Sequence, residues 1–87
     1  IMKYSARVIE LDSILKDITS KIMVSDVGTS VSLALGTLRG AYLNVLVNTK
    51  LMKDKEYATN LEKLSEKMLV KYSAIANQTY NDVLERL

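Results

Sequence analysis

The fold is decided by residues 27–49, which read VGTSVSLALGTLRGAYLNVLVNT. Arg39 is the only charged residue in this stretch, and the chain contains no proline that would interrupt a helix. A helix that is apolar on most of its sides is typically buried, either inside a bundle of helices or in a membrane. The stretch therefore predicts a central helix that is enclosed by its neighbours.

Small or polar residues recur at every fourth position of this helix. Residues four apart lie on one face, so the row forms a strip that another helix backbone can approach closely. Gly36 and Gly40 at its centre repeat a spacing that membrane helices also use. A membrane span would bury Arg39 at a cost of about 2.5–3.5 kcal/mol, so we favour a helix inside a bundle and expect no membrane partner. The row consists of Gly28, Ser32, Gly36, Gly40, Asn44 and Asn48.

The segment before this helix, residues 1–22, has apolar side chains at alternating spacings of three and four. This pattern is typical of a helix with one packed seam. Ser25 and Asp26 follow, and their short side-chain oxygens can cap a new helix, so we expect a break at residues 24–26. The predicted seam consists of Ile1, Tyr4, Val8, Leu11, Leu15, Ile18 and Ile22.

A third helix is predicted after the short basic connector of residues 50–53, with Asp54 as its cap. A helix of about thirty residues is ~45–50 Å long at 1.5 Å per residue, so we expect it to outrun the first two. The sequence thus predicts an all-α fold, an antiparallel bundle of three helices with a buried central helix, as part of a larger helical domain. The apolar stripe of the third helix consists of Tyr57, Leu61, Leu64, Met68, Tyr72, Ile75, Tyr80, Val83 and Leu87.

The composition of the 87 residues excludes several classes of chemistry. With no cysteine and no histidine, the chain cannot supply a zinc finger, a thiol nucleophile or a Ser-His-Asp triad, and we expect no metal site. Its net charge of +2 is too small to indicate a nucleic-acid partner. A chain this short buries only roughly 60–65% of its unfolded surface, which favours a homo-oligomer formed by helix packing, or additional sequence.

Three motifs carry a resemblance to a known family. Ser25-Asp26-Val27-Gly28, the run GAYLNVLVN at residues 40–48 and KDKEY at residues 53–57 resemble the carboxy-terminal half of the cyclodeaminase domain of the formiminotransferase-cyclodeaminase family. Relatives of this family include stand-alone methenyltetrahydrofolate cyclohydrolases. The resemblance covers residues 25–87 and includes residues 1–24 only as a preceding helix. Ser20 stands near a position where family members often have asparagine. The family's glycine-rich loop and the segment with its catalytic aspartate have no counterpart in this sequence.

The resemblance implies that residues 1–87 are the carboxy-terminal part of a cytoplasmic, dimeric folate enzyme of one-carbon metabolism and histidine degradation. Its substrate would be a tetrahydrofolate derivative, without a metal. The enzyme would convert 5-formiminotetrahydrofolate to 5,10-methenyltetrahydrofolate with release of ammonia, or hydrolyse methenyltetrahydrofolate. Because the family's catalytic acid lies outside the matching part, we predict no catalytic residue here and an inactive isolated chain.

Five residues are candidates for substrate binding. Asp26 matches the family motif, although an aspartate at a helix start also acts as a cap. Asn44 and Asn48 lie in an apolar helix, so their amides need hydrogen bonds from a neighbouring helix or from a polar ligand such as a pterin ring. Tyr42 is suited to stacking on a pterin or to core packing. Arg39 is suited to a carboxylate partner, either in the protein or in the glutamate tail of folate.

The spacing of these candidates constrains the site. Asp26 and Asn44 are eighteen residues apart, which is about five helical turns, so they share a face but lie ~27 Å apart along the axis. One chain cannot direct both at one folate carbon, and we hypothesise that antiparallel copies of the helix bring them together. A non-catalytic helical dimerisation module is the alternative function, because the seam spacing is equally compatible with it.

Overall fold

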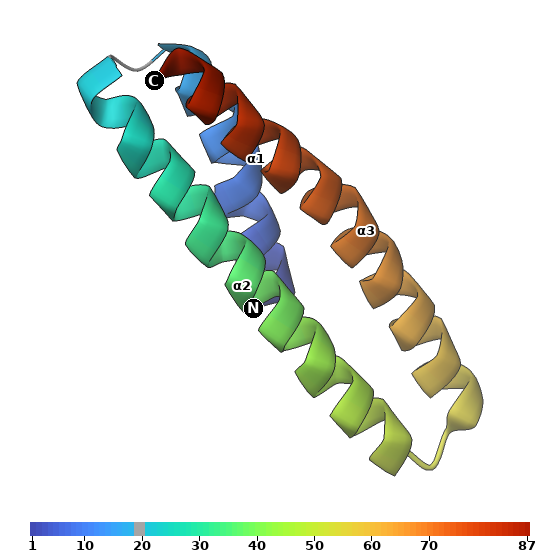
Figure 1. Cartoon of the computed structure of the whole chain (residues 1–87). Coiled ribbons are helices and arrows are strands. Elements are labelled where there is room, and N and C mark those ends of the chain that lie inside the picture. The colour runs from blue at the N-terminus through green and yellow to red at the C-terminus, as the bar shows by residue number, and fades with distance from the viewer. Residues whose placement is uncertain (19–20) are drawn as a thin grey trace.

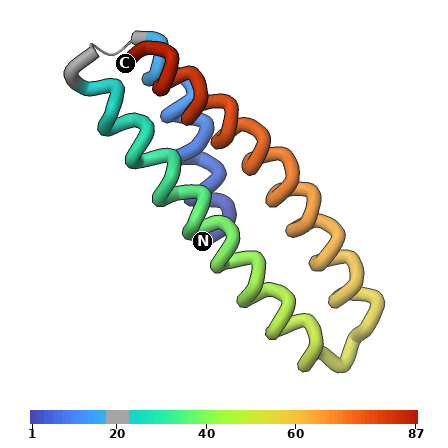
Figure 2. Tube along the Cα trace, viewed as in Figure 1, coloured from blue at the N-terminus to red at the C-terminus, as the bar shows by residue number. Residues whose placement is uncertain are grey.

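The computed structural model of the chain describes residues 1–18 and 21–87. They form three helices, α1 (Met2–Ile18), α2 (Lys21–Leu51) and α3 (Lys55–Arg86). α2 and α3 run antiparallel along their whole lengths, and α1 packs against the half of this pair that holds the chain's carboxyl end (Figures 1 and 2). The rod measures 51 × 15 × 15 Å. The predicted all-α bundle of three helices is confirmed.

The start of α2 differs from the prediction. The helix begins at Lys21 and runs through Ser25 and Asp26 without a break, so Asp26 is an exposed residue of the second turn and not a cap. The physical reason is burial, because the continuous helix places Val24 and Val27 in one buried cluster with Val83 of α3. Ser20 and the side chains of Ile18 and Ile22 lie outside the described part of the chain.

The start of α3 agrees with the prediction. Asp54 is the N-cap, and its carboxylate accepts a hydrogen bond of 3.0 Å from the backbone N–H of Tyr57.

The prediction that the third helix outruns the second is wrong, because α2 has 31 residues and α3 has 32. Both helices outrun α1, which has 17 residues, so part of the rod is a two-helix hairpin.

The predicted seam of α1 faces outward, which is a second correction. Tyr4 is 80% exposed, and Ile1 and Leu11 are also exposed, whereas Ala6 and Ile9 on another face are buried, Ile9 in the main core with residues of α2 and α3. Small side chains let α1 sit close to both long helices, and the bulky seam would hold it further away. Within this chain, the exposed α1 seam consists of Ile1, Tyr4, Val8, Leu11, Ile14 and Leu15.

All three helices pack against one another, and α2 makes the most extensive contacts with the other two. Its inner side, with Val31 and Leu38, forms the main core, but its outer side is open and Leu33 is 69% exposed. The neighbouring helices therefore do not cover α2 on most of its sides within the described residues.

Residues 23–51 are long and apolar enough to cross a membrane by length and composition, with a mean hydropathy of 1.3. The core helix of a bundle also passes this test.

Candidate functional site

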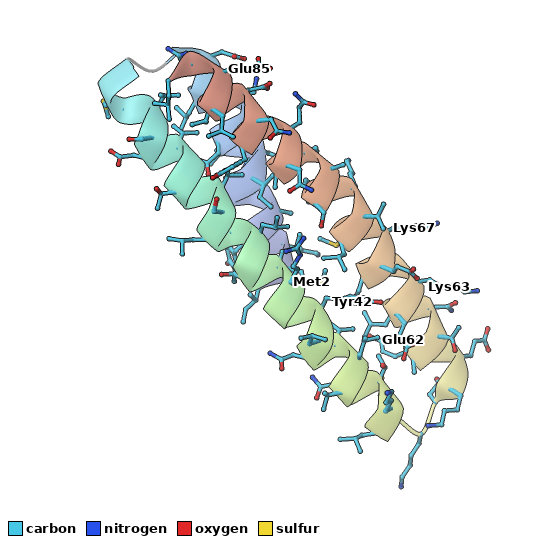
Figure 3. The ribbon with its side chains drawn as sticks, viewed as in Figure 1. Met2, Tyr42, Glu62, Lys63, Lys67 and Glu85 are labelled. Carbon is cyan, nitrogen blue, oxygen red and sulfur yellow. The ribbon has the colours of Figure 1, made fainter. Side chains whose placement is uncertain are left out.

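Asn44 and Asn48 lie in one groove, which we call the amide groove. It has a volume of about 380 Å³ and forms where the amino end of α1 meets α2 and α3. Ala41 and Val45 of α2 and Met68 of α3 give it an apolar lining. The remaining lining residues are Ile1, Met2, Lys3, Leu61, Leu64 and Ser65, and Figure 3 shows Met2 beside α2.

The two amides are exposed and one helical turn apart. Within residues 1–18 and 21–87, neither Asn44 nor Asn48 makes a side-chain hydrogen bond. One of the two roles predicted for Asn44 and Asn48 was a hydrogen bond to a neighbouring helix. The described residues do not contain such a bond. Their donors and acceptors are available to a ligand or a partner.

Asp26 lies in a different groove, which we call the Asp26 groove. It runs between α1 and α2, has a volume of about 590 Å³ and includes Thr29, Ser30, Tyr4 and Leu33 in its lining. Hydroxyl groups and one carboxylate thus stand beside large apolar side chains. The structure does not bring Asp26 together with Asn44 and Asn48, because all three are on the single helix α2 and Asp26 is several turns away.

A buried carboxyl group, Asp12 of α1, interacts with Ser30 of the Asp26 groove and was missed by the sequence reasoning. Asp12 is only 4% exposed. It is hydrogen-bonded to the Ser30 side chain, yet burial is the stronger effect and raises the pKa of Asp12. Its Oδ2 atom has no hydrogen-bond partner among the described residues. Met2, Ser5, Ile9 and Asp12 are spaced 3-4-3 and so share the buried face of α1. This spacing could have indicated that Asp12 is buried, but the pattern is not apolar at Ser5 and Asp12.

The other two candidates lie elsewhere. Tyr42 is half-buried and packs against the main core, pointing from α2 toward α3 (Figure 3). Arg39 is exposed. Neither residue lines the amide groove or the Asp26 groove.

Polar contacts between helices fix the position of α3. The Tyr72 hydroxyl donates to Glu10 of α1 at 2.5 Å, and this bond raises the pKa of Tyr72. Lys16 of α1 forms an ion pair of 3.0 Å with Asp82. The hydrogen bond that Lys16 donates to Asp82 raises the pKa of Lys16, while the bonds that Asp82 accepts from Gln78 and then from Lys16 lower the pKa of Asp82. These contacts hold α1 against α3.

The residues that the structure describes hold no group of three or more carboxylates that could bind a metal ion. The polar groups of the two grooves are amides, hydroxyls, the Asp26 carboxylate and the Lys3 ammonium, beside apolar side chains. Such a mixture suits an organic ligand with a flat or apolar body and several polar atoms.

One known protein family matches most of this chain. Residues 1–67 match formiminotransferase-cyclodeaminase, in the carboxy-terminal domain of that family. The chain belongs to the formiminotransferase-cyclodeaminase family. The match includes α1, which the sequence motifs did not cover, and it ends at Lys67, within α3. No curated protein and no solved structure matches the chain.

Membership in the formiminotransferase-cyclodeaminase family makes this a cyclodeaminase-type domain, from enzymes that act on folate derivatives. The matched residues contain Asp26, Asn44 and Asn48, and nearly all of the lining of both grooves.

Proposed function

We propose that this chain is part of a cytoplasmic enzyme that acts on a one-carbon tetrahydrofolate. The reaction is the conversion of 5-formiminotetrahydrofolate to 5,10-methenyltetrahydrofolate with release of ammonia, or the hydrolysis of methenyltetrahydrofolate. The observation that supports this most directly is the pair of exposed amides, Asn44 and Asn48, in a groove of about 380 Å³ within a family-matched segment. Grooves of about 300–1,000 Å³ are typical of small-molecule sites.

The amide groove offers what a pterin ring requires. A pterin carries both hydrogen-bond donors and acceptors on one edge, and a primary amide supplies both kinds of group. The apolar side chains Val45 and Met68 form walls against which a flat ring can lie. Lys3 at the margin is a cation that suits an anionic substituent. We propose Asn44 and Asn48 as the principal substrate-binding residues.

Asp26, Arg39 and Tyr42 have subsidiary parts in this proposal. Asp26 accepts hydrogen bonds from ligand N–H groups in its own groove, and Arg39 attracts a glutamate tail from the exposed side of α2. Tyr42 acts indirectly, because its packing against α3 holds the segment that carries the two amides.

Both reactions need proton transfer at a nitrogen or oxygen bonded to the one-carbon unit. Neither groove holds a carboxyl group near the two amides, so we propose that the acid-base group comes from a segment other than these residues. This chain then contributes walls and binding groups. The isolated chain should produce no methenyltetrahydrofolate in a spectrophotometric assay, and measurable turnover would refute this division of roles.

Equilibrium binding tests the proposal. Calorimetric titration with 5-formyltetrahydrofolate should show saturable binding, and the double variant Asn44→Ala/Asn48→Ala should bind about 10–100-fold more weakly, because each lost hydrogen bond is worth about 0.5–1.5 kcal/mol. Asn60→Ala, which removes an exposed amide from α3, is the matched control and should bind like the wild type. Absence of binding by the wild type would refute the folate function.

A non-catalytic dimerisation module is the second candidate. The exposed apolar outer side of α2, with Leu33, Leu43 and Val47, favours it. This alternative predicts self-association without any affinity for folate, so the same titration separates the two.

A further inference from the structure

The Asp26 groove differs from the amide groove in the charge and polarity of its side chains. No lysine or arginine is among its lining residues in the described part of the chain, whereas Lys3 lines the amide groove. The two grooves therefore suit ligands of different charge. Six polar side chains line the Asp26 groove: Tyr4, Ser5, Asp26, Thr29, Ser30 and Thr37.

The threonine hydroxyls of this groove already donate their protons within α2. Thr29 Oγ1 donates to the backbone carbonyl of Ser25 at 3.1 Å, and Thr37 Oγ1 donates to that of Leu33 at 3.0 Å. A hydroxyl has one proton and two lone pairs, so a hydroxyl that has donated its proton offers a ligand only acceptor sites. Thr29 and Thr37 thus present acceptors.

Ser30 presents an acceptor for a different reason. Its side chain is hydrogen-bonded to Asp12 of α1, which is 4% exposed. An ionised carboxylate can only accept, so Ser30 is the donor of this bond and keeps only lone pairs for a ligand. Together with the Asp26 carboxylate, four of the six polar side chains offer acceptors and no donor.

These acceptors are concentrated at one end of the groove. Asp26, Thr29 and Ser30 lie within about 6 Å of one another along the helix axis, at 1.5 Å per residue. Large apolar side chains, including Leu33 of α2 and Val8 of α1, complete the lining. The groove thus combines a negatively charged end rich in acceptors with an apolar wall.

We infer that the Asp26 groove binds a small organic cation in which a planar amidinium or guanidinium group is attached to an apolar body. A carboxylate accepts two parallel N–H bonds from such a group, and the neighbouring hydroxyl oxygens accept the remaining N–H groups. The Tyr4 ring, 80% exposed, offers a face that attracts cations. The volume of about 590 Å³ is that of a small-molecule site. This inference does not rest on the proposed folate function.

Titration with benzamidine, followed by the backbone amide signals in ¹H–¹⁵N NMR spectra, tests the site. Benzamidine carries an amidinium group on a flat apolar ring, and it should shift the signals of Asp26, Ser30 and Ala34 in a saturable manner. The signals of Asn44 and Asn48 should stay in place. Benzoate, which has the same ring with a carboxylate, should shift none of these signals. Equal binding of benzoate, or shifts confined to the amide groove, would overturn the inference.

Two variants test which groups bind the cation. Asp26→Asn keeps the shape of the side chain and should weaken benzamidine binding about 5-fold, the upper range for an exposed ion pair. Ser30→Ala removes one acceptor and should weaken it about 3-fold. Glu56→Gln removes an exposed carboxylate from the first turn of α3 and should bind like the wild type. Unchanged binding by Asp26→Asn, or an equal loss in Glu56→Gln, would refute a site at Asp26. Signals outside the groove that match the wild type show that each variant is folded.

Discussion

Replacing Asp12 by asparagine should stabilise the bundle at neutral pH. The Asp12 side chain lies between α1 and α2, is 4% exposed and has one oxygen without a hydrogen-bond partner in the described structure. Its bond to Ser30 only partly offsets the cost of burial, which raises the pKa of Asp12 above its ordinary 3.8. Asparagine has a similar shape, keeps an acceptor for Ser30 and carries no charge.

The gain follows from the cost of the buried charge. A buried polar group without a partner costs about 1–3 kcal/mol, and more when it is charged. Part of that cost remains in the variant, because the amide group also lacks one partner. We therefore expect Asp12→Asn to raise the free energy of unfolding by about 1 kcal/mol at pH 7, a fraction of what a small domain has in total.

The pH dependence supplies the decisive signature. Because the pKa of Asp12 is raised in the folded state, the protonated form is the one that folding favours. Its stabilising contribution is complete below pH 3.8 and is lost as the pH rises through the folded-state pKa. The wild type should therefore lose stability relative to Asp12→Asn over this interval, and the difference should level off at higher pH.

Urea unfolding followed by far-ultraviolet circular dichroism, repeated from pH 3 to pH 8, measures this difference. Glu66→Gln removes a negative charge from an exposed position on α3 and controls for the change in net charge. A difference between wild type and Asp12→Asn that stays constant over the whole range would refute the reasoning, as would an asparagine variant that is less stable at pH 7.

Three further predictions follow from single contacts. Alanine in place of glycine usually stabilises a helix by roughly 1 kcal/mol, but Gly28→Ala should not, because its Cβ would lie 3.0 Å from Val83 Cγ1. Urea unfolding should show the gain in stability only when Val83→Ala is added. A gain from Gly28→Ala alone would contradict the contact. Asp82→Asn should lower the unfolding midpoint at pH 7 but not at pH 2. Because the pKa of Asp82 is lowered in the folded state, its carboxylate stabilises the fold above the ordinary carboxyl pKa range, and this stabilisation is lost as the pH falls and the carboxylate is protonated. Equal losses at pH 7 and pH 2 would exclude the ion pair with Lys16. Glu10→Gln should move one tyrosine titration, followed by ultraviolet absorbance, down toward pH 10.0, since the bond to Glu10 raises the pKa of Tyr72; an unchanged titration would mean that this bond does not form in solution.

The number of helices, their order and the cap at Asp54 follow from local sequence. An aspartate three residues before a free backbone N–H is a local device, so Asp54 and Tyr57 could be paired from spacing alone. The same device at Asp26 gave a wrong helix start, because capping residues favour a helix end without imposing one. Burial of Val24 and Val27 against Val83, a contact between distant segments, decides the outcome there.

The inner face of each helix was harder to predict for a related reason. Periodicity identifies where large apolar residues lie, but the buried faces of these helices also include small residues such as Ala6, Ala34 and Ala76. Some large residues, such as Tyr4, lie outside these faces. The amide groove could be predicted only in part, since Asn44 and Asn48 share a helix face but Lys3 reaches them through tertiary packing.

Residues that the fold does not need are the clearest indication of function in this chain. We predict that Asp12 lowers stability, but it is buried and has a partner in Ser30, so its effect is within the bundle. Gly36, Gly40, Asn44 and Asn48 are different, because they are exposed and touch nothing that requires them. Leucine or alanine at any of these four positions would favour the helix more strongly. A helix that holds two glycines and two amides on an open apolar side is therefore better explained by what binds there than by the stability of the isolated bundle.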